Sequence, residues 1–426
     1  MLSLFSVSMP RAGHHVAEMV LGRLLGSQFA YCEFYTIRSC CKAIPCTRIP
    51  DHAAAGAVLF MQKSHDHDLT DPSDPGLDGL LIQVREPVAR ALSNYELDLR
   101  TVGPPHSPEY MRFWLGLEAA YTVGFIEKWC ATPDPRSFLL KYEDLLSDPV
   151  TYYLRLFERF GLPMRAFDAE KVIAAQSLSS GDKKPFKERE IRSSPHFDQE
   201  SMADFQRIIA RSAAKLDYVP HAELGRATGR SRAVALAFEA KQRMLQGRPK
   251  EALVALDGYL TLQDAHVFGR RLRAGLLAGL GDLDAAEADL QAVIAAEPGH
   301  ARAYLDLAEL QRKRGSQTAA RLTLEQCLER ARDPARAGEL VLQAFSEPAL
   351  TAAARAVAPK PPVTREDVVA AFRFILGRAP EDDRVVESHQ RVGSAAELRD
   401  ILLRSPEFAE KYRKLIASAA PPRRTA

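Results

Sequence analysis

The chain has 426 residues, of which 46% are hydrophobic and 26% are charged, and these proportions exclude a collagen-like fibre and a wholly disordered chain. Lys and Arg number 57 against 55 for Asp and Glu, and this net charge of +2 argues against a nucleic-acid partner. No apolar run reaches the roughly 18 residues that a membrane-spanning helix needs, and the first residues lack the basic start of a signal peptide. The sequence therefore predicts a cytoplasmic protein without a membrane span.

The length suggests about two to four domains, and the texture of the sequence changes twice along the chain. We expect three domains: an α/β domain over residues 1–225, helical repeats over 233–345 and a small helical domain over 362–418.

The first segment alternates short β-rich runs with helical patterns. The run Leu4–Met9 is followed by a turn and then by a helical pattern over Val16–Leu25. Three further apolar runs have the length of buried strands, namely Val58–Gln62, Leu80–Val84 and Ser137–Lys141. Strands that alternate with helices predict an α/β fold with a parallel sheet. Because ligands of such sheets bind outside the carboxyl ends of the strands, the residues after each run are candidate site residues.

Four of the six cysteines lie close together in the sequence. They are Cys32, Cys40, Cys41 and Cys46. A disulfide framework is not expected in a reducing cytosol, and the spacing lacks the paired C-x2-C segments of a typical zinc site. We favour buried thiols over a metal site, and we expect no metal.

A 34-residue period begins after residue 233. Gly247, Gly281 and Gly315 share this spacing. Three other registers keep it as well: Ala240, Ala274 and Ala308; Ala252, Ala286 and Ala320; Leu256, Leu290 and Leu324. A glycine between two helices, with small residues where the helices cross, resembles the tetratricopeptide repeat family. This resemblance implies an all-α solenoid that binds a protein partner.

A proline-rich break over 358–363 precedes the last segment. Thr364 is placed to cap a helix that begins at Arg365, with Asp367 in the position of a capping box. Residues 374–380 and 404–408 resemble a bacterial helical domain of unknown function that is often attached to surface-glycan enzymes.

The first candidate motif is Pro10-Arg-Ala-Gly-His-His15, between a β-rich run and a helical pattern. A turn at this point directs the backbone N–H groups of a helix start toward the sheet edge, where they attract an anion. Arg11 adds a positive charge suited to phosphate or sulfonyl oxygens. The motif is not a Walker A loop, because G-x-x-x-x-G-K-[ST] is absent. An ordinary turn remains the alternative, with His14 and His15 only at a helix start.

Two further motifs follow the next apolar runs. Lys63 and His65 lie two residues apart after one run and could converge on a reacting group, since a neutral His accepts a proton near pH 7. Arg85 ends the next run, Pro87 fits a first helical turn, and Ser93 lies two turns beyond Arg85. Both motifs could equally be solvated polar residues.

The fourth motif is Tyr142-Glu-Asp-Leu145, after the last run. Tyr142 could stack on a base, or it could cover the core.

Together and in this order, the four motifs resemble the sulfotransferase family that uses 3′-phosphoadenylyl sulfate as donor. Its phosphosulfate loop Pro-(Lys/Arg)-Ser-Gly-Thr-Thr corresponds to residues 10–15, and its Lys-Thr-His motif corresponds to 63–65. Its Arg-x-Pro motif with a Ser eight residues after the Arg corresponds to 85–93, and Tyr-Glu-Asp-Leu to 142–145. Two histidines replace the threonine pair, and Val16 replaces the aromatic residue that often follows. The resemblance covers about half of the chain and implies a P-loop-like three-layer sandwich.

The resemblance also implies the reaction, which is transfer of the sulfonyl group from 3′-phosphoadenylyl sulfate to an acceptor hydroxyl. It implies these roles: Arg11, Ala12, Gly13, His14 and His15 bind the phosphosulfate; Arg85 and Ser93 bind the 3′-phosphate; Tyr142 lies near the adenine; Lys63 and Arg11 stabilise the transferred group; and His65 is the general base. Asp66 or Asp68 could replace His65 as the base.

Other readings of the sequence stay open. A nucleotide kinase would need a P-loop lysine and a magnesium-binding carboxylate, and neither is found. A non-catalytic repeat scaffold with a degenerate nucleotide-binding domain is the main alternative. The acceptor is expected to contact the loops 99–110 and 175–200. We expect a hydroxyl on a carbohydrate, from the resemblance of the last segment, with a small alcohol or a peptide tyrosine as the alternatives.

Overall fold

The computed structural model describes the chain except for residues 34–40, 42, 102–104, 133, 163–190, 226–231, 264–265, 345–362, 377, 391, 393–394, 404, 406 and 409–426. The chain divides into two compact units, Met1–Glu297 and Pro298–Ala426. Each unit is described by itself. Among the described residues, no helix is both long enough and apolar enough to cross a bilayer.

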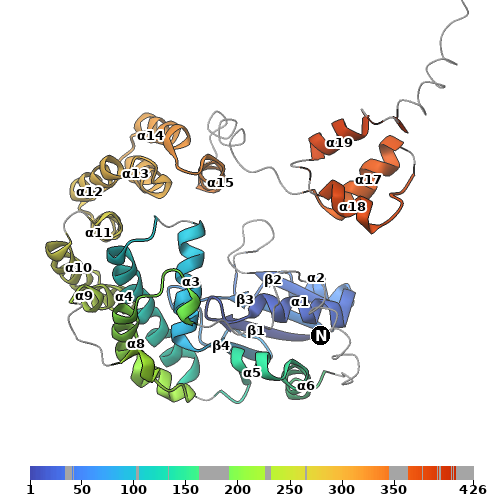
Figure 1. The fold of residues 1–426 in the computed structure, drawn as a ribbon, viewed down its shortest axis with the longest axis horizontal. Coiled ribbons are helices and arrows are strands. Elements are labelled where there is room, and N and C mark those ends of the chain that lie inside the picture. Colours follow the sequence, from blue (N-terminus) through green and yellow to red (C-terminus); the bar gives the residue numbers. More distant parts are fainter. Residues whose placement is uncertain are drawn as a thin grey trace, which may run out of the picture. The chain divides into compact units, whose positions relative to one another are not determined.

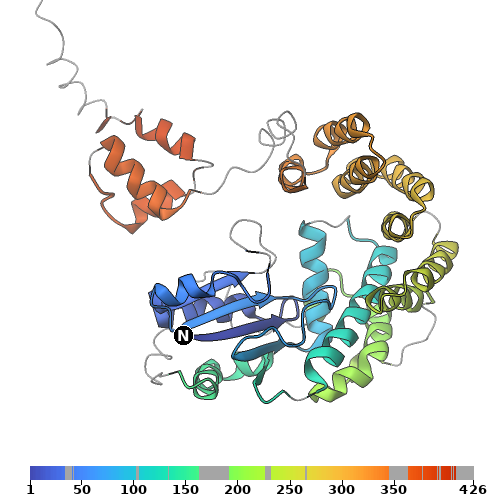
Figure 2. The ribbon, with the colours of Figure 1, turned by 180° about the vertical axis from the view of Figure 1, so that it is seen from behind.

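The first unit is built on a five-stranded parallel sheet, drawn in blue to teal in Figures 1 and 2. Its strands are β1 (Leu2–Ser8), β2 (Phe29–Glu33), β3 (Leu59–Ser64), β4 (Gly79–Val84) and β5 (Ser137–Lys141). The order across the sheet is β2-β3-β1-β4-β5. The connection that follows β1 leads to β2 at one edge of the sheet, and the connection that follows β4 leads to β5 at the other edge. The two connections therefore diverge between β1 and β4, which are neighbours in the sheet. Ligands of open α/β sheets bind at such a point.

Alternating residues of the central strands bury both faces of the sheet. On one face, Leu4 of β1 and Leu81 of β4 pack in one core cluster with Val20 of the first helix and with Tyr153. On the other face, Phe5 of β1 and other buried strand residues form a second core cluster. The helical residues around position 125 belong to this cluster. The sheet therefore lies between two helical layers.

The helices of this part follow the strands in the expected alternation. They are α1 (His14–Leu25), α2 (Ile49–Ala54), α3 (Pro87–Thr101), α4 (Pro108–Phe125), α5 (Tyr142–Ser147), α6 (Pro149–Arg159) and α8 (Gln199–Ala213). Single turns of 3-10 or π helix lie at 26–28, 126–130, 191–193, 214–216 and 222–224. Helices α1, α5 and α6 cover one face of the sheet, and α4 with its π-helical end covers the other.

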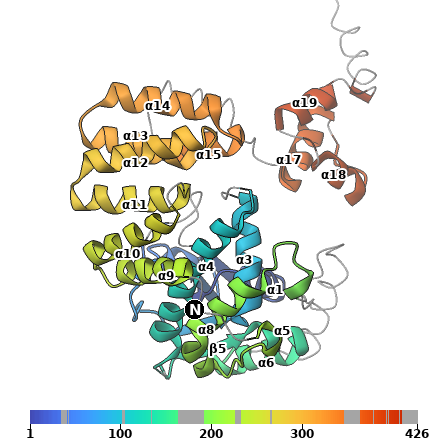
Figure 3. The same ribbon diagram turned by 60° about the vertical axis from the view of Figure 1, so that its left-hand side comes forward.

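Helix α4 also joins the sheet to the repeats. Its Phe113 packs in one cluster with Ala237 and Ala252 of the first two repeat helices, α9 (Arg232–Leu245) and α10 (Pro249–Leu262). Figure 3 shows α9 and α10 beside α4. At Gly116 the backbones approach so closely that an added Cβ would lie 2.6 Å from Ala237 Cβ and from the Val234 carbonyl oxygen.

The repeat helices continue in pairs with glycine turns, as the period predicts. They are α11 (Val267–Leu280) and α12 (Leu283–Ala296) in the first unit, and α13 (Ala301–Lys313), α14 (Gln317–Arg330) and α15 (Pro334–Ala344) in the second. Gly247, Gly281 and Gly315 have positive φ, between 68° and 91°, which L-residues with a side chain adopt only with strain. The alanines and leucines of the other three registers are buried.

The last described helices form a small core of their own in the second unit. They are α17 (Arg365–Ala371) with its π-helical continuation Phe372–Leu376, α18 (Asp383–Gln390) and α19 (Ala395–Leu403). Thr364 and Asp367 form the expected capping box at the start of α17. Val368, Phe372 and Leu398 pack in the core. Arg404 and Gly377 of the two resembling phrases lie outside the described residues.

The parallel sheet and the helical repeats are confirmed, whereas some strand bounds differ from the predicted ones and one strand was not predicted. β5 has the expected bounds, whereas β1 begins two residues before Leu4 and β3 continues two residues past Gln62 to Ser64. β2 was not predicted, because its five residues include Cys32 and Glu33 and most are only half-buried. The boundaries of the three domains stay a prediction.

The contact at Gly116 predicts that a methyl group cannot be added between α4 and α9. We expect Gly116→Ala to lower stability by about 1–3 kcal/mol despite the better helix propensity of Ala, because the neighbours at 2.6 Å are backbone and Cβ atoms. Urea unfolding followed by tryptophan fluorescence measures this, since Trp114 is on α4. Gly275→Ala on α11 is the matched control; its Cβ would meet no atom within 4 Å, and we expect an unchanged or higher midpoint. Equal midpoints for both variants would contradict the packing described here.

Candidate functional site

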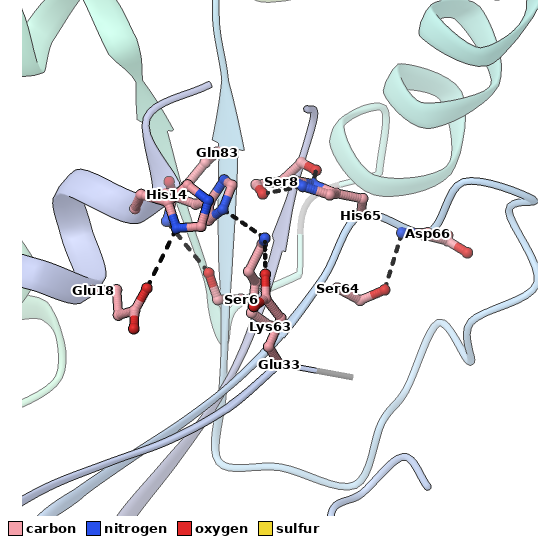
Figure 4. A network of polar contacts seen from close by, with 11 residues as sticks. Ser6, Ser8, His14, Glu18, Glu33, Lys63, Ser64, His65, Asp66 and Gln83 are labelled. Carbon is pink, nitrogen blue, oxygen red and sulfur yellow. Dashed lines mark hydrogen bonds and ion pairs between the residues drawn. The ribbon is translucent and has the colours of Figure 1, made fainter. Parts of the chain in front are cut away.

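The candidate site lies at the carboxyl ends of β1, β3 and β4, three strands that are neighbours in the sheet (Figure 4). Val7 is paired with Ser64, and Ser8 with Gln83, so the three strands end at the same edge. This register brings the first three candidate motifs together, although Arg11 and Ser93, for example, are 82 residues apart in the chain.

The turn between β1 and α1 is built from two residues with positive φ, Arg11 at 69° and Gly13 at 89°. An added Cβ at Gly13 would lie 2.6 Å from Cδ2 of Tyr142, so only glycine lets the turn pass under this ring. The Ala12 N–H donates to the Met9 carbonyl and is already used. Within the described residues no side chain caps α1, and its first turn holds no acidic residue, so the positive end of the helix is not neutralised there.

Lys63 lies at the centre of the polar network in Figure 4, and 1% of its surface is exposed. Its ammonium donates to Glu33 Oε1 at 2.8 Å and to His14 Nε2 at 2.6 Å. Burial lowers the pKa of Lys63 to about 8, although the Glu33 carboxylate favours the charged form. Lys63 therefore carries its charge in neutral solution and loses it in mildly alkaline solution.

His14 is a buried neutral imidazole. Burial and the charge of Lys63 lower its pKa far below the ordinary value. Because Nε2 accepts from the ammonium, the proton of the neutral ring lies on Nδ1. Nδ1 is buried and has no hydrogen-bond partner within the described parts of the chain. A buried N–H of this kind is costly unless it has an acceptor, so His14 offers a donor for a ligand oxygen.

His65 is held in a fixed orientation beside His14. Its Nδ1 donates to the Ser8 carbonyl oxygen at 2.6 Å, and its own carbonyl accepts from the Tyr121 hydroxyl at 2.6 Å. Burial and the nearby ammonium of Lys63 lower the pKa of His65, so the ring is neutral. The rings of His14 and His65 are 4.8 Å apart and meet edge to face.

The two carboxylates next to His65 have other surroundings. Asp66 accepts from Lys128 Nζ at 2.7 Å and from the Trp129 indole N–H at 2.8 Å, and its side chain is 1% exposed. Asp68 is exposed to solvent. Asp66 therefore takes part in a buried ion pair with Lys128. His65, in contrast, contacts Ser8 and the ring of His14.

Arg11 and Arg85 bring two positive charges to the same edge. Arg11 Nε donates to the Ser93 hydroxyl at 3.0 Å, and Arg85 Nη1 donates to the Arg11 carbonyl oxygen at 3.3 Å. The motif at 10–15 and the motif at 85–93 are thus in direct contact through Arg11 and Ser93. Burial lowers the pKa of each guanidinium, and the nearby charges of Arg100 and Arg85 lower that of Arg11 further, so an anion beside them would be favourable.

Tyr142 begins α5 and contacts both arginine motifs. The Arg85 guanidinium lies over its ring at 4.6 Å from the centroid, and the ring edge lies against Gly13. Tyr142 therefore packs against both Arg85 and the turn. A nucleotide base stacked on this ring would have the Arg85 guanidinium as a second neighbour of the ring.

Two residues of the site, Glu33 and Ser8, were not predicted from the sequence. Glu33 ends β2 and lies beside Lys63 in the register of β2 and β3. The alternation of large and small residues over Phe29–Glu33 is the signal that could have found this strand. Ser8 ends β1, and its contact with His65 arises only from the pairing of β1 and β3.

The site also contains a group of possible metal ligands. Ligand atoms of His14, His15 and Glu33 lie within 4.8 Å of one another. The Lys63 ammonium already contacts two of these residues, Glu33 and His14, and so supplies a cation there. His15 is exposed and its Nδ1 lies 3.4 Å from Glu18. The expectation of a metal-free site stays a prediction.

The loops expected to contact the acceptor are described in part. Residues 102–104 and 175–190 lie outside the described residues. A cavity of about 480 Å³ lies beside residues 105–110 and is lined also by His266 and Phe268 at the start of α11. Its lining also includes Glu109 and Glu297.

Comparison with known protein families identifies one part of the chain. Residues 277–343 match the tetratricopeptide repeat family. The matched residues include all of α12, α13 and α14, which confirms the repeat prediction for this segment. The comparison with curated proteins finds no match for the chain. The sheet and its site are therefore interpreted from their own geometry.

The contact between Gly13 and Tyr142 predicts a coupled loss of stability. We expect Gly13→Ala to destabilise the protein by about 3 kcal/mol, from the left-handed backbone and from overlap with the ring. In a Tyr142→Ala background the overlap is gone, and the same change should cost about 1–2 kcal/mol. Urea unfolding of the four proteins gives the cycle. An equal cost in both backgrounds would contradict the close approach.

Proposed function

We propose that the α/β part of the chain is a sulfotransferase that moves the sulfonyl group of 3′-phosphoadenylyl sulfate to an acceptor hydroxyl. The observation that carries the proposal is the meeting of Arg11, Lys63 and Arg85 at one sheet edge, around an uncapped helix start and the buried donor of His14. Such a site suits a ligand with several negative charges. The strand order β2-β3-β1-β4-β5 and the ordered motifs support a P-loop-like fold with a different anion loop.

The phosphosulfate would bind at the start of α1. The backbone N–H groups of 13–15 and the helix dipole favour an anion there, and Arg11 adds a full charge. In place of the family's threonine hydroxyl, His14 would donate its Nδ1–H to a phosphosulfate oxygen. This replacement keeps a neutral donor, because Lys63 holds the other ring nitrogen.

The 3′-phosphate would bind beside Arg85 and Ser93. The hydrogen bond from Arg11 to Ser93 links this region with the phosphosulfate region, so both ends of the donor would contact one connected set of side chains. The ring of Tyr142 fixes Arg85 and would border the adenine.

The transfer step needs positioning and charge stabilisation more than covalent catalysis. The acceptor oxygen forms a bond to sulfur while the bond between sulfur and the bridging oxygen breaks, and the electron pair stays on the phosphate oxygen. The Lys63 ammonium would stabilise this charge. His65 would take the acceptor proton, since its ring is neutral and Asp66 is bound to Lys128.

The repeats add a second proposed role, which is to bind a protein partner. Tetratricopeptide repeats commonly mediate protein interactions, and residues 277–343 match this family. We retain a carbohydrate as the proposed acceptor, on the resemblance of the last segment to domains attached to surface-glycan enzymes, and the cytoplasm as the proposed location. A non-catalytic scaffold is the competing function.

The donor site predicts tight binding of the reaction product 3′,5′-bisphosphoadenosine. We expect this nucleotide to raise the midpoint of thermal unfolding, because it binds the folded state. Arg85→Ala should weaken binding about 10- to 100-fold through loss of a charge-assisted contact of roughly 1.5–3 kcal/mol. Arg207→Ala is the control, since Arg207 is half exposed on α8.

Isothermal titration calorimetry of the three proteins gives the affinities. If the bisphosphate does not stabilise the native chain, the non-catalytic scaffold is favoured. An equal loss of affinity in Arg85→Ala and Arg207→Ala would contradict the assigned site.

The pKa of Lys63 predicts how the affinity for 3′,5′-bisphosphoadenosine depends on pH. Below about 8 the ammonium is charged and attracts the 5′-phosphate, and above it the charge is lost from the free protein. A bound anion raises the pKa, so the affinity should fall by up to about tenfold per pH unit above pH 8 until the pKa of the complex is reached. Lys63→Arg keeps its charge and should bind with little change between pH 7.5 and 9.5. A wild-type affinity that is constant over this range would contradict a role for Lys63 in donor binding.

A further inference from the structure

Three cysteine sulfurs meet on one side of β2, outside the proposed donor site. The Sγ atoms of Cys32, Cys41 and Cys46 all lie within 4.8 Å of one another. Those of Cys41 and Cys46 are 3.4 Å apart. Cys32 and Cys46 are buried, and Cys41 is partly exposed, so the group is closed on the protein side and open to solvent at one sulfur.

The backbone around the three sulfurs is held by a buried glutamine. Gln62 of β3 accepts from the Cys46 N–H at 2.8 Å and donates to the Ala43 carbonyl at 2.7 Å. Cys32 lies opposite Gln62 in the register of β2 and β3. The backbone at Ala43 and Cys46 is thus fixed to the same pair of strands that carries Cys32. The approach of the sulfur atoms therefore does not depend on one flexible side chain.

We propose that Cys32, Cys41 and Cys46 bind one zinc ion through their sulfur atoms. Zinc–sulfur bonds of about 2.3 Å in a tetrahedron separate the sulfurs by about 3.8 Å, and the three sulfurs here have separations of this order. Each thiol that binds the ion releases its proton to solvent. A disulfide between Cys41 and Cys46 would use two of the three sulfurs and leave Cys32 unexplained.

The zinc would have a structural effect on the neighbouring site. Successive residues of a strand point to opposite faces, so Cys32 and Glu33 direct their side chains to opposite sides of β2. A metal bound to Cys32, Cys41 and Cys46 would tie the end of β2 to Cys41 and Cys46 and so fix the strand that presents Glu33 to Lys63. The ion itself lies outside the proposed reaction.

The metal content of the full chain tests this proposal. The protein is purified anaerobically with a reductant, given one equivalent of Zn²⁺, dialysed and analysed by mass spectrometry of the metal. We expect about one zinc per chain, and its loss in Cys32→Ser and Cys46→Ser. Cys130→Ser and Cys327→Ser are the matched controls and should keep the ion, because neither is part of the group.

Cobalt substitution of the wild-type chain keeps the test independent of whether the variants fold. We expect a thiolate-to-cobalt charge-transfer band in the near ultraviolet and strong visible bands of a tetrahedral ion. Absence of the charge-transfer band overturns the proposal. Zinc retained in both Cys32→Ser and Cys46→Ser overturns it as well, as does zinc lost only in His15→Ala, which would assign the ion to His14, His15 and Glu33. A Cys41–Cys46 disulfide in the anaerobic protein would also exclude it.

Discussion

The ammonium group of Lys63 is buried between the Glu33 carboxylate and the His14 ring, and the arrangement of the candidate site depends on this contact. A buried charge without partners costs several kcal/mol, so both partners must be in place when the sheet forms. Glu33 comes from β2, Lys63 from β3 and His14 from the start of α1. One interaction therefore joins three elements and fixes the tautomer of His14, whose second nitrogen becomes a buried N–H donor with no partner among the described residues.

The sheet order explains why this contact can form. β3 lies between β2 and β1, so the ends of all three strands are adjacent, and β4 brings Arg85 from the other side of β1. The turn after β1 then needs a left-handed Gly13, because Tyr142 of the fourth motif lies directly against it. Each motif of the site thus constrains another: Arg11 contacts Ser93, Arg85 contacts Tyr142, and Tyr142 limits the turn.

Local patterns predicted the elements of the fold better than the contacts of the site. The run Ser137–Lys141 and the 34-residue period were found because a buried strand and a helical repeat are encoded by neighbouring residues. β2 was missed because its residues are mixed in polarity and mostly half-buried at the sheet edge. The candidate residues were found by the order of their motifs, whereas the Lys63–Glu33 pair depends on the register of β2 against β3, which local sequence does not encode.

The chemistry at the sheet edge is tested most directly by transfer of labelled sulfate from 3′-phosphoadenylyl sulfate to extracted glycans, lipids and proteins. The proposed mechanism predicts a labelled product with the native chain. With His65→Ala we expect a rate about 10²- to 10⁴-fold lower and unchanged binding of the bisphosphate, since the role proposed for His65 concerns the acceptor proton and not the donor. No labelled product in any extract, from a chain that binds the donor, would contradict the assignment of a sulfotransferase, and a His65→Ala rate close to the native one would contradict the assigned base.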